Sequence, residues 1–549
     1  MTTDEQRDVI AFLSTPEAYG LRAGFASADA SASAKASAGF RGSLGEGESA
    51  RQAVERIDTH ISIVWLTGDR VYKLKRAVHF DYVDFSTIEL RRIACEAEVR
   101  LNRRTAPSLY LGVRPVTREA GGALALGGQG EPIDWVVEMV RFDQDTLFDR
   151  LAERHRLDAG LMEGLADAIV RLHAGAEPRT DRGGQGGMAW VIDGNALGFA
   201  EQGATLLDRA ACERLTADAR AALDRHAERL NARRDRGMVR ACHGDLHLRN
   251  ICLVGGIPTL FDAVEFNEDI SCIDVFYDLA FLLMDLWRRD LRSHANLVFN
   301  EYLSRTLDLE GLSLLPLFLS CRAAVRAKTS ATAAKVQPDE RQKGELQAAS
   351  REYLALAQEL LRARPACLVA VGGLSGSGKS TLARRIAPFV GATPGALVVR
   401  SDVIRKTLLG VSSLTRLGPE GYTADVTRQV YETMAERAKR ALEAGHAVVA
   451  DAVYARPVDR DAIAAVGRAT GVPFIGLWID GPLEILASRL RERVNDASDA
   501  TADVLALQAR TELGPLDWHR LDGSTDVESV ERSAQAIMAQ SAPLLFRFP

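Results

Sequence analysis

The sequence predicts a mixed α/β and α+β chain of two domains, in which a small lobe with a sheet and a larger helical lobe precede a doubly wound parallel sheet. The chain has 549 residues, too many for one hydrophobic core. A long periodic stretch over 339–364 ends at Pro365, and beyond it apolar strand-like runs alternate with helix-like segments. We therefore expect a first domain over 1–364 and a second over 365–549.

The small lobe is predicted from a hairpin pattern followed by helical periodicity. The hairpin turns at Thr67-Gly68-Asp69, between two runs rich in β-branched and aromatic residues. The expected elements are strands at 61–66 and 71–75, a helix at 87–102 and a strand at 135–140. Before them, residues 28–39 are rich in alanine and serine and lack bulky apolar side chains, which predicts a flexible insertion.

The overall composition is that of a globular protein, with 47% hydrophobic residues, 26% charged residues and a net charge of -6. This balance gives no general attraction to nucleic acid or to an anionic membrane. The seven cysteines are scattered and never spaced as CxxC, which predicts reduced thiols packed in cores. The first residues show no signal sequence, and the longest apolar stretch, 276–287, is interrupted by Asp278 and Asp285. We expect a cytoplasmic protein without a membrane partner.

The octapeptide GLSGSGKS at 373–380 fits the phosphate-loop pattern at each fixed position. It follows the apolar run 368–371 and precedes the helix-like segment 382–385, which is the context that this motif requires. Its glycines allow backbone N–H groups to surround a polyphosphate, its lysine can reach the outer phosphates, and the hydroxyl of Ser380 can hold Mg²⁺. The residues expected to contact the nucleotide are Gly373, Gly376, Gly378, Lys379, Ser380 and Thr381. A Gly/Ser-rich turn without a ligand is the alternative, but both flanks favour a nucleoside triphosphate site.

A second pattern, HGDLHLRN at 243–250, places Asp245 five residues before Asn250, and Asp262 follows a strand candidate at 257–261. Phosphoryl transfer needs a carboxylate near the acceptor hydroxyl and oxygen ligands for Mg²⁺. These three side chains could supply both. A polar loop stabilised by its own Asp and Asn side chains is the alternative. The aspartate after the next strand favours the site.

Over about residues 50–335, these motifs resemble the aminoglycoside phosphotransferase family. That family has a two-lobed fold like that of protein kinases, and it uses an HGDxxxxN loop and a downstream metal-binding aspartate. The resemblance implies that Asp245 is the catalytic base and that Asn250 and Asp262 hold the metal ion.

The same resemblance implies a nucleotide-orienting pair in the small lobe. Lys73, on the second strand of the hairpin, would pair with the nucleotide phosphates, and Glu98 on the next helix would orient this lysine. Lys75 shares the strand face of Lys73, and Glu96 competes with Glu98, so both alternatives stay open. Residues 138–140 would form the hinge that contacts adenine. The hairpin lacks the GxGxxG loop of protein kinases, which leaves the cover over the phosphates undefined.

The second domain carries further acidic residues after its predicted strands. The strand at 396–399 leads to Asp402 and Arg405, and the strand at 447–450 leads to Asp451. In doubly wound sheets, ligand groups collect at the carboxyl ends of the strands. This half resembles the P-loop small-molecule and polynucleotide kinases, including the zeta-toxin-like group. That likeness implies that Asp402 activates the acceptor hydroxyl, Arg405 binds the acceptor, and Asp451 lies near Mg²⁺ or the substrate. A helix cap and a surface ion pair are the alternative for Asp402 and Arg405.

After a strand candidate at 477–480, an arginine-rich helix follows. In the P-loop kinases, such a segment forms a lid whose arginines stabilise charge on the transferring phosphoryl group. Arg489 and Arg493 fall on one helical face, as this role requires. An ordinary basic helix surface explains the pattern equally well.

Together the two resemblances imply an ATP- and Mg²⁺-dependent phosphotransferase with two sites and small-molecule hydroxyl substrates. Two rival hypotheses remain at this point. The P-loop half could phosphorylate nucleic-acid ends, so a nucleic-acid partner is disfavoured but not excluded. Alternatively, one domain could bind ATP without turnover and regulate the other. The acceptors and the oligomeric state do not follow from the sequence.

Overall fold

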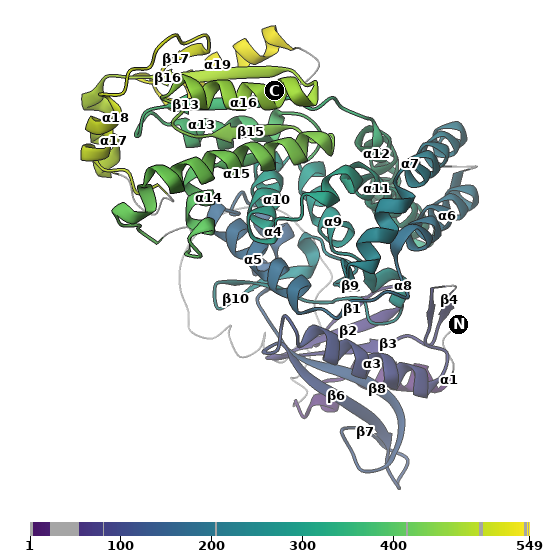
Figure 1. Ribbon diagram of the computed structural model, residues 1–549. Helices are drawn as coiled ribbons and strands as arrows, with labels where there is room; N and C mark the ends of the chain where they lie inside the picture. Colours follow the sequence, from purple (N-terminus) through teal and green to yellow (C-terminus); the bar gives the residue numbers. More distant parts are fainter. Residues whose placement is uncertain are drawn as a thin grey trace. The chain divides into compact units, whose positions relative to one another are not determined.

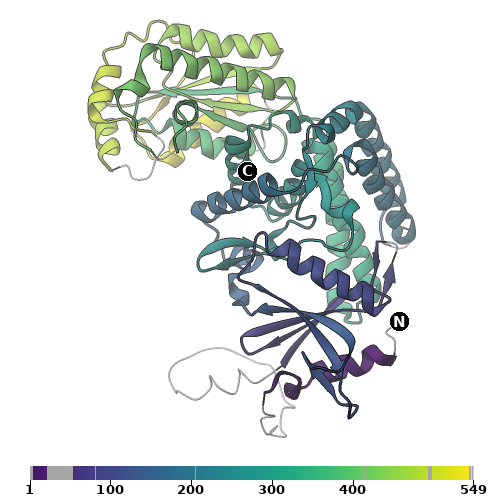
Figure 2. The same cartoon turned by 60° about the horizontal axis from the view of Figure 1, so that its bottom comes forward.

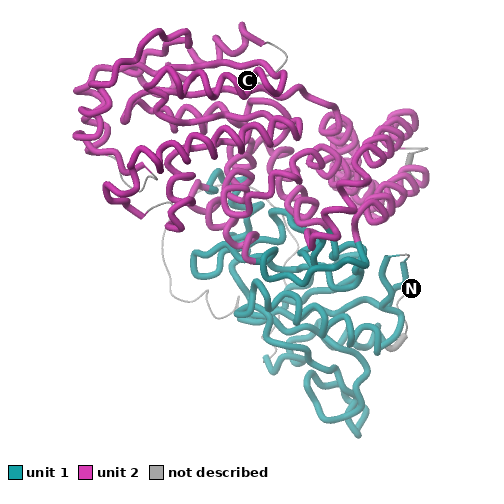
Figure 3. Tube along the Cα trace, in the orientation of Figure 1, with its two compact units in different colours: residues 1–157, 172–182, 239–273 teal, residues 158–171, 183–238, 274–549 magenta. Residues whose placement is uncertain are grey.

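A computed structural model describes residues 4–21, 54–80, 82–203, 206–412, 415–492, 498–542, 546 and 548 (Figure 1, and turned in Figure 2). The predicted insertion at 28–39 lies outside these residues. The chain divides into two compact units, which Figure 3 shows in different colours. Unit 1 comprises residues 1–157, 172–182 and 239–273, and unit 2 comprises residues 158–171, 183–238 and 274–549.

Unit 1 is built around an antiparallel sheet with the strand order β1-β2-β3-β8-β6-β7. Its main elements are α1 (Asp4–Leu13), β1 (Val54–Asp58), β2 (Ser62–Thr67), β3 (Arg70–Lys75), β4 (His79–Phe80), β5 (Val83–Asp84), α3 (Ile88–Asn102), β6 (Tyr110–Arg118), β7 (Leu124–Leu126), β8 (Glu131–Val140), α4 (Phe148–Glu153), β9 (Val239–Ala241), β10 (Ile251–Val254), β11 (Ile257–Leu260) and α8 (Glu268–Ser271). The predicted hairpin, the helix after it and the strand that ends at residue 140 are confirmed. Helix α5 (Ala159–Gly175) and strand β12 (Cys272–Asp274) have residues in both units.

Helices α1 and α3 cover opposite faces of this sheet (Figure 2). Leu13 of α1 packs with Trp65 and Leu74 in one buried cluster, whereas Cys95 of α3 packs with Val137 of β8 in another. Because successive side chains of a strand point to opposite faces, the neighbours of Leu74 on β3 point toward the α3 side. This alternation directs two lysines of β3 toward the helix.

Unit 2 contains a group of long helices and a parallel sheet. Its elements are α6 (Gly184–Gly203), α7 (Arg209–Asp235), α9 (Val275–Arg288), α10 (Arg292–Thr306), α11 (Leu315–Val336), α12 (Glu340–Leu361), β13 (Leu368–Gly373), α13 (Lys379–Ile386), β14 (Leu397–Arg400), α14 (Ser401–Leu408), α15 (Ala424–Glu443), β15 (Val448–Asp451), α16 (Pro457–Thr470), β16 (Phe474–Asp480), α17 (Leu483–Glu492), α18 (Ala502–Gln508), β17 (His519–Asp522) and α19 (Val527–Ser541). The long periodic stretch before Pro365 forms α12, as predicted. The domain boundary at 364/365 stays a proposal, because unit 2 includes residues from both sides of it.

The sheet of unit 2 is parallel throughout and has the order β14-β15-β13-β16-β17. Val369 and Val371 of β13 pack with α13 and α19 on one face. Leu368 and Ala370 are also fully buried and point to the other face. Both faces are therefore covered, and the predicted doubly wound parallel sheet is confirmed.

The cysteine prediction is confirmed as well, since all seven thiols are free and buried. Within the described ranges, none of the helices combines the length and the apolar character needed to cross a membrane.

Candidate active sites

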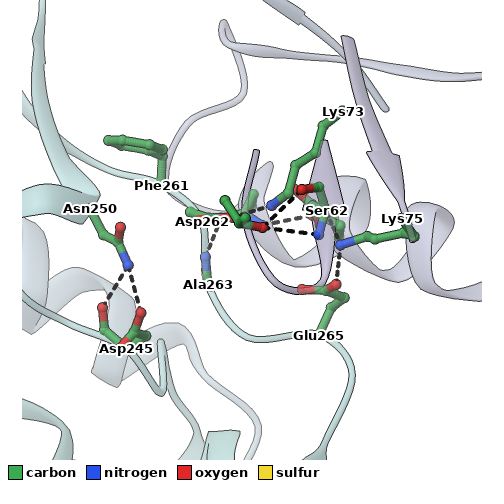
Figure 4. A network of polar contacts seen from close by, with 12 residues as sticks. Ser62, Lys73, Lys75, Asp245, Asn250, Phe261, Asp262, Ala263 and Glu265 are labelled. Carbon is green, nitrogen blue, oxygen red and sulfur yellow. Dashed lines mark hydrogen bonds and ion pairs between the residues drawn. The ribbon is translucent and has the colours of Figure 1, made fainter. Parts of the chain in front are cut away.

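Lys73 connects helix α3 to the segment that follows β11. Its Nζ lies 2.9 Å from Glu98 Oε1 and 2.5 Å from Asp262 Oδ1 (Figure 4). Burial acts to lower the pKa of Lys73, but the negative charges of Asp262 and Glu98 outweigh it and hold this pKa well above its usual value. The lysine is therefore a cation at neutral pH, as an interaction with phosphates requires.

Lys75, the alternative lysine, is more deeply buried. Its side chain is 1% exposed, and its Nζ contacts Glu98 and Glu265. The side chain of Lys73 is 13% exposed. Lys73 therefore has the better access to a ligand, while Lys75 acts as an internal counter-ion. Glu265 was not predicted from the sequence, although an acidic residue three positions after Asp262 was a possible signal.

The two candidate glutamates of α3 point in different directions. Glu98 is fully buried and contacts both lysines. Glu96 is 52% exposed and forms an ion pair with Arg92 at 2.6 Å. Thr87 caps the start of α3 by accepting a hydrogen bond from a backbone N–H of the first turn, which fixes where the helix begins. The geometry thus joins Glu98, and not Glu96, to Lys73.

Asp245 and Asn250 lie together in the loop between β9 and β10. The amide nitrogen of Asn250 donates to the backbone oxygen of Asp245 at 2.9 Å and to its Oδ2 at 3.0 Å (Figure 4). His247 Nε2 lies 3.3 Å from the same Oδ2. The Asp245 carboxylate remains 39% exposed. It is held in one orientation and is still accessible to a substrate.

The conformation of this loop depends on Gly244. Its φ is +82°, and a Cβ there would lie 3.2 Å from the carbonyl oxygen of Ile270. The ring nitrogen Nε2 of His243 lies 2.9 Å from the carbonyl oxygen of Phe261. His243 thereby joins the loop of Asp245 to the segment that carries Asp262.

Asp262 and Asn250 offer the oxygen ligands that Mg²⁺ prefers. The side chain of Asp262 is 41% exposed. Because the nitrogen of Asn250 donates to Asp245, its oxygen is the amide atom that a cation can bind. The donor chemistry of the two side chains, an amide oxygen and a carboxylate, therefore suits a Mg²⁺ ion.

Glu138, in the predicted hinge, turns its carboxylate away from Lys73. It accepts hydrogen bonds from Arg114 Nε at 2.6 Å and from the Tyr72 hydroxyl at 3.3 Å. Tyr72 leaves β3 on the face opposite to Lys73. A contact with adenine would have to come from the backbone of residues 138–140, and it stays a prediction.

The phosphate loop joins β13 to α13. Gly376 and Gly378 have φ values of +84° and +91°, which favour glycine. A Cβ at Gly378 would meet no atom of the described residues within 4 Å, so these residues leave open space beside the loop at this position. Lys379 and Ser380 start α13 and are buried, and Thr381 follows. The helix N-terminus and the loop form a cradle suited to a polyphosphate.

Asp451 lies at the carboxyl end of β15, directly beside the strand that leads into the phosphate loop. It is in register with Val371 of β13 on one side and with Arg400 of β14 on the other. Arg400 Nε lies 3.4 Å from Asp451 Oδ2. The other carboxylate oxygen, Oδ1, is buried and has no hydrogen-bond partner within the described part of the chain. A buried acceptor in this state suits a cation or a substrate hydroxyl.

Asp402 and Arg405 lie on α14, which starts at the same edge of the sheet. Asp402 is in the first helical turn and is partly exposed. Arg405 is buried, donates through Nη1 to the carbonyl oxygen of Gly421 at 2.8 Å and stacks 4.7 Å from the ring centroid of Tyr422. The structure therefore holds Arg405 against the segment 419–422.

Arg489, the first predicted lid arginine, contacts backbone carbonyl groups. Its Nη1 donates to Gly523 at 2.8 Å and its Nη2 to Thr525 at 3.3 Å. Arg493, the second, lies outside the described residues. Gln508 of α18 was not predicted from the sequence; its Oε1 accepts a hydrogen bond from the N–H of Ser375 in the phosphate loop at 2.9 Å. A single glutamine on a short helix gives no sequence signal for such a contact.

Two family models match this chain in separate places. Residues 90–315 match the phosphotransferase enzyme family, and residues 368–512 match an AAA domain. Two similar curated proteins are uncharacterized proteins of Mycobacterium tuberculosis (strain H37Rv) and Mycobacterium bovis. Each is 29% identical to the chain over 485 residues, which covers 85% of this chain and 91% of the relative.

Solved structures that are similar to part of the chain include three proteins named as kinases or phosphotransferases. A gluconokinase from Sinorhizobium meliloti 1021 is 24% identical, with 33% of this chain and 96% of that chain covered and a TM-score of 0.25. A choline/ethanolamine kinase family protein from Mesorhizobium loti is 12% identical, with coverages of 56% and 92% and a TM-score of 0.33. A thermostable mutant of an aminoglycoside phosphotransferase is 14% identical, with coverages of 55% and 94% and a TM-score of 0.35.

The family matches agree with the two groups of residues described above. The first match contains Glu98, Asp245, Asn250 and Asp262, and the second contains the phosphate loop, Asp402 and Asp451. Both matches support phosphoryl transfer of the kinase type. The chain therefore carries a domain of the phosphotransferase enzyme family and a P-loop kinase-type domain in one polypeptide.

Proposed function

We propose that each domain transfers the terminal phosphoryl group of ATP to a hydroxyl group of a small molecule, and that the first domain spans 1–364 and the second 365–549. The observation that carries the proposal is the position of Lys73, whose Nζ contacts both Glu98 and Asp262. A buried lysine held between two carboxylates is suited to phosphate binding, and the accessible carboxylate of Asp245 is suited to hydroxyl activation. We also propose a cytoplasmic location, as the sequence suggests.

In the first domain, Asp245 would accept the proton of the acceptor hydroxyl. The amide of Asn250 and the ring of His247 orient its carboxylate. Lys73 would leave Asp262 and bind nucleotide phosphate oxygens, while Glu98 keeps the lysine in place. Asn250 and Asp262 would hold Mg²⁺, which when bound neutralises charge on the phosphates.

In the second domain, the backbone N–H groups of 373–380 and the ammonium of Lys379 would bind the outer phosphates of ATP. Ser380 and Asp451 would hold the Mg²⁺ ion. Asp402 would accept the proton of the acceptor hydroxyl. Arg405 would orient the acceptor, and Arg489 and Arg493 would stabilise charge on the transferring phosphoryl group.

The experiment is a screen of hydroxyl acceptors with labelled ATP on the full chain and on two variants, Asp245→Ala and Lys379→Ala. The panel contains sugars, sugar acids, amino alcohols, aminoglycosides, nucleosides and oligonucleotides with free 5′ ends. Asp245→Ala is expected to reduce transfer to the first domain's acceptor by roughly 10²–10⁴-fold. Lys379→Ala is expected to abolish transfer only to the second domain's acceptor.

Two surface variants serve as matched controls. Asp218→Ala and Lys439→Ala remove the same charges from exposed helix positions and should leave both transfers unchanged. If oligonucleotides are the only acceptors that the second domain labels, its substrates are nucleic-acid ends and not small molecules. ATP binding without transfer to any acceptor, and without an effect of either variant on function, would contradict the enzymatic proposal and favour a regulatory nucleotide site.

A further inference from the structure

The backbone around Asp262 receives hydrogen bonds from one short stretch of unit 1, the end of α3 and the connection to β6. The Thr105 hydroxyl donates to the carbonyl oxygen of Leu260 at 2.7 Å. The N–H of Asp262 donates to the Tyr110 hydroxyl at 3.1 Å. The N–H of Ala263 donates to Asn102 Oδ1 at 2.8 Å. Three side chains within nine positions of sequence thus bind three of the four residues from Leu260 to Ala263.

The loop of Asp245 binds the same backbone from another direction. The N–H of Phe261 donates to the carbonyl oxygen of Asn250 at 3.0 Å, and the N–H of Val264 donates to the carbonyl oxygen of His243 at 2.9 Å. Every backbone N–H from Phe261 to Val264 therefore has a partner. Two of the four partners are the side chains of Asn102 and Tyr110.

Asp262 needs such support because its backbone is strained. Its φ is +61°, in the left-handed region that non-glycine residues rarely adopt. A residue in this conformation persists only where its surroundings hold it. If the backbone relaxed, the carboxylate would turn away from its position beside Lys73 Nζ.

We propose that Asn102, Thr105 and Tyr110 are positioning residues that hold the Asp262 carboxylate in the orientation that binds Mg²⁺. The inference rests on the proposed function of the first domain. It adds to that function three residues that touch neither nucleotide nor metal and act through the backbone.

Helix α3 also links the position of Lys73 to that of Asp262. Asn102 lies one turn after Glu98, and its amide nitrogen donates to the Glu98 carbonyl oxygen at 2.9 Å. The same helix therefore holds the carboxylate that binds Lys73 and the amide that binds the segment of Asp262. The lysine and the metal ligand are placed relative to each other by one rigid element.

The hydroxyl of Tyr110 can be tested apart from its ring. The ring packs against Val99 and Val137 in a buried cluster, which is a contribution to stability that phenylalanine would keep. Among the described residues, the bond that the hydroxyl adds is the one from the N–H of Asp262. Burial, and then the nearby carboxylates of Glu98 and Asp262, raise the pKa of Tyr110 well above its usual value, so the hydroxyl stays neutral.

The test measures binding of a non-hydrolysable ATP analogue to the full chain by calorimetry, with Mg²⁺ and with EDTA. All proteins carry Lys379→Ala, so that the phosphate loop does not contribute. Tyr110→Phe and Thr105→Val are each expected to lower the Mg²⁺ affinity of the analogue complex by about 10-fold. Binding in EDTA should change less than about twofold, because neither side chain touches the nucleotide. Tyr19→Phe is the matched control, since it removes a hydroxyl that donates to Leu13 at 2.5 Å.

The possible results distinguish a failure of the proposed nucleotide site from a failure of the positioning role of Thr105 and Tyr110. If the Lys379→Ala protein binds no analogue, the proposed site in the first domain is wrong, and the inference falls with it. If it binds with a Mg²⁺ effect that Tyr110→Phe and Thr105→Val leave intact, only the inference is wrong. Equal losses with Mg²⁺ and with EDTA would show a general structural role and would also overturn the inference. Thr105→Val provides the answer if Tyr110→Phe does not fold.

Discussion

Asn300 accepts a hydrogen bond from the backbone N–H of Val398 at 2.7 Å, and this contact joins a long helix of unit 2 to its parallel sheet. Val398 belongs to β14, the edge strand, whose outer N–H and C=O groups face no further strand in the part of the chain that the structure describes. The amide nitrogen of Asn300 also donates to the carbonyl oxygen of Ala396 at 3.2 Å. One asparagine of α10 thus takes the place of a neighbouring strand.

Replacing Asn300 by alanine should therefore loosen the strand that leads into Asp402. We expect a loss of about 1–3 kcal/mol in the free energy of unfolding, because the N–H of Val398 loses its partner, while the carbonyl of Ala396 keeps its bond from Asn296 at 3.0 Å. Hydrogen exchange of the β14 amides would measure the change. Gln337→Ala removes an exposed amide on another element and should cost under about 0.5 kcal/mol. Unchanged exchange in β14 would contradict the role of Asn300.

His446 lies between Phe299 of α10 and Gly395, close to the contact of Asn300 with β14. This histidine makes the stability of unit 2 depend on pH. The ring lies 5.2 Å from that of Phe299, and its Nε2 is 2.9 Å from the carbonyl oxygen of Gly395. Burial lowers the pKa of His446 from 6.5 to about 4. The unfolded chain therefore binds a proton between these pH values that the folded chain does not. Stability is complete above pH 6.5 and declines as the pH falls toward 4, by roughly 3 kcal/mol in total.

The variant His446→Gln tests whether stability declines with falling pH because of this histidine. Glutamine can still donate to Gly395 but does not titrate. The difference in unfolding free energy between wild type and variant, from urea unfolding at several pH values, should be constant above pH 6.5. It should shift in favour of the variant at lower pH. Parallel curves over the whole range would mean that His446 is not the group that titrates.

The sequence predicted those parts of the two sites in which spacing and residue type carry the chemistry. Asp245, Asn250 and the phosphate loop follow fixed motifs, and Asp262 stands directly after a strand. Tyr110 could not be found in this way, because it acts on the backbone of a residue 152 positions away and its own surroundings look like an ordinary core.

The choice between Lys73 and Lys75 was also beyond the sequence. Both lysines point to the same face of β3, so periodicity cannot separate them. What distinguishes them is the carboxylate that each meets from the segment after β11, Asp262 for Lys73 and Glu265 for Lys75. That pairing arises only when the segment folds back onto the sheet.

Replacing Lys75 by methionine should strongly destabilise unit 1. Lys75 contacts Glu98 and Glu265, which are both buried, and its loss would leave Glu265 without its cation. We expect a loss of about 3–5 kcal/mol, because an uncompensated buried charge is costly. Hydrogen exchange of the β3 amides would report the change.

A double variant separates charge from packing. Lys75→Met combined with Glu265→Met removes the charged pair together and should recover most of the stability. Arg341→Met breaks an ion pair whose side chains are 88% and 63% exposed, and should cost under about 0.5 kcal/mol. If the double variant is no more stable than Lys75→Met alone, burial of an unpaired carboxylate is not the cause.

Two glycines of the phosphate loop should respond differently to alanine. At Gly378 a Cβ has open space, so Gly378→Ala adds only backbone strain, about 1–2 kcal/mol. At Gly376 a Cβ would also lie 2.4 Å from the carbonyl oxygen of Leu486, so α17 would have to move and the loss of stability should be larger.

Gly445→Ala is the control, since that glycine has a φ of +80° and open space but lies before β15, at the amino end of the strand. It should lose as much stability as Gly378→Ala while ATP affinity, measured in an Asp262→Ala background, stays the same. Equal ATP affinity in all three variants would contradict a nucleotide site at this loop. Backbone strain at Gly376 or Gly378 should displace the N–H groups of the loop that bind phosphate, and this displacement should lower the ATP affinity.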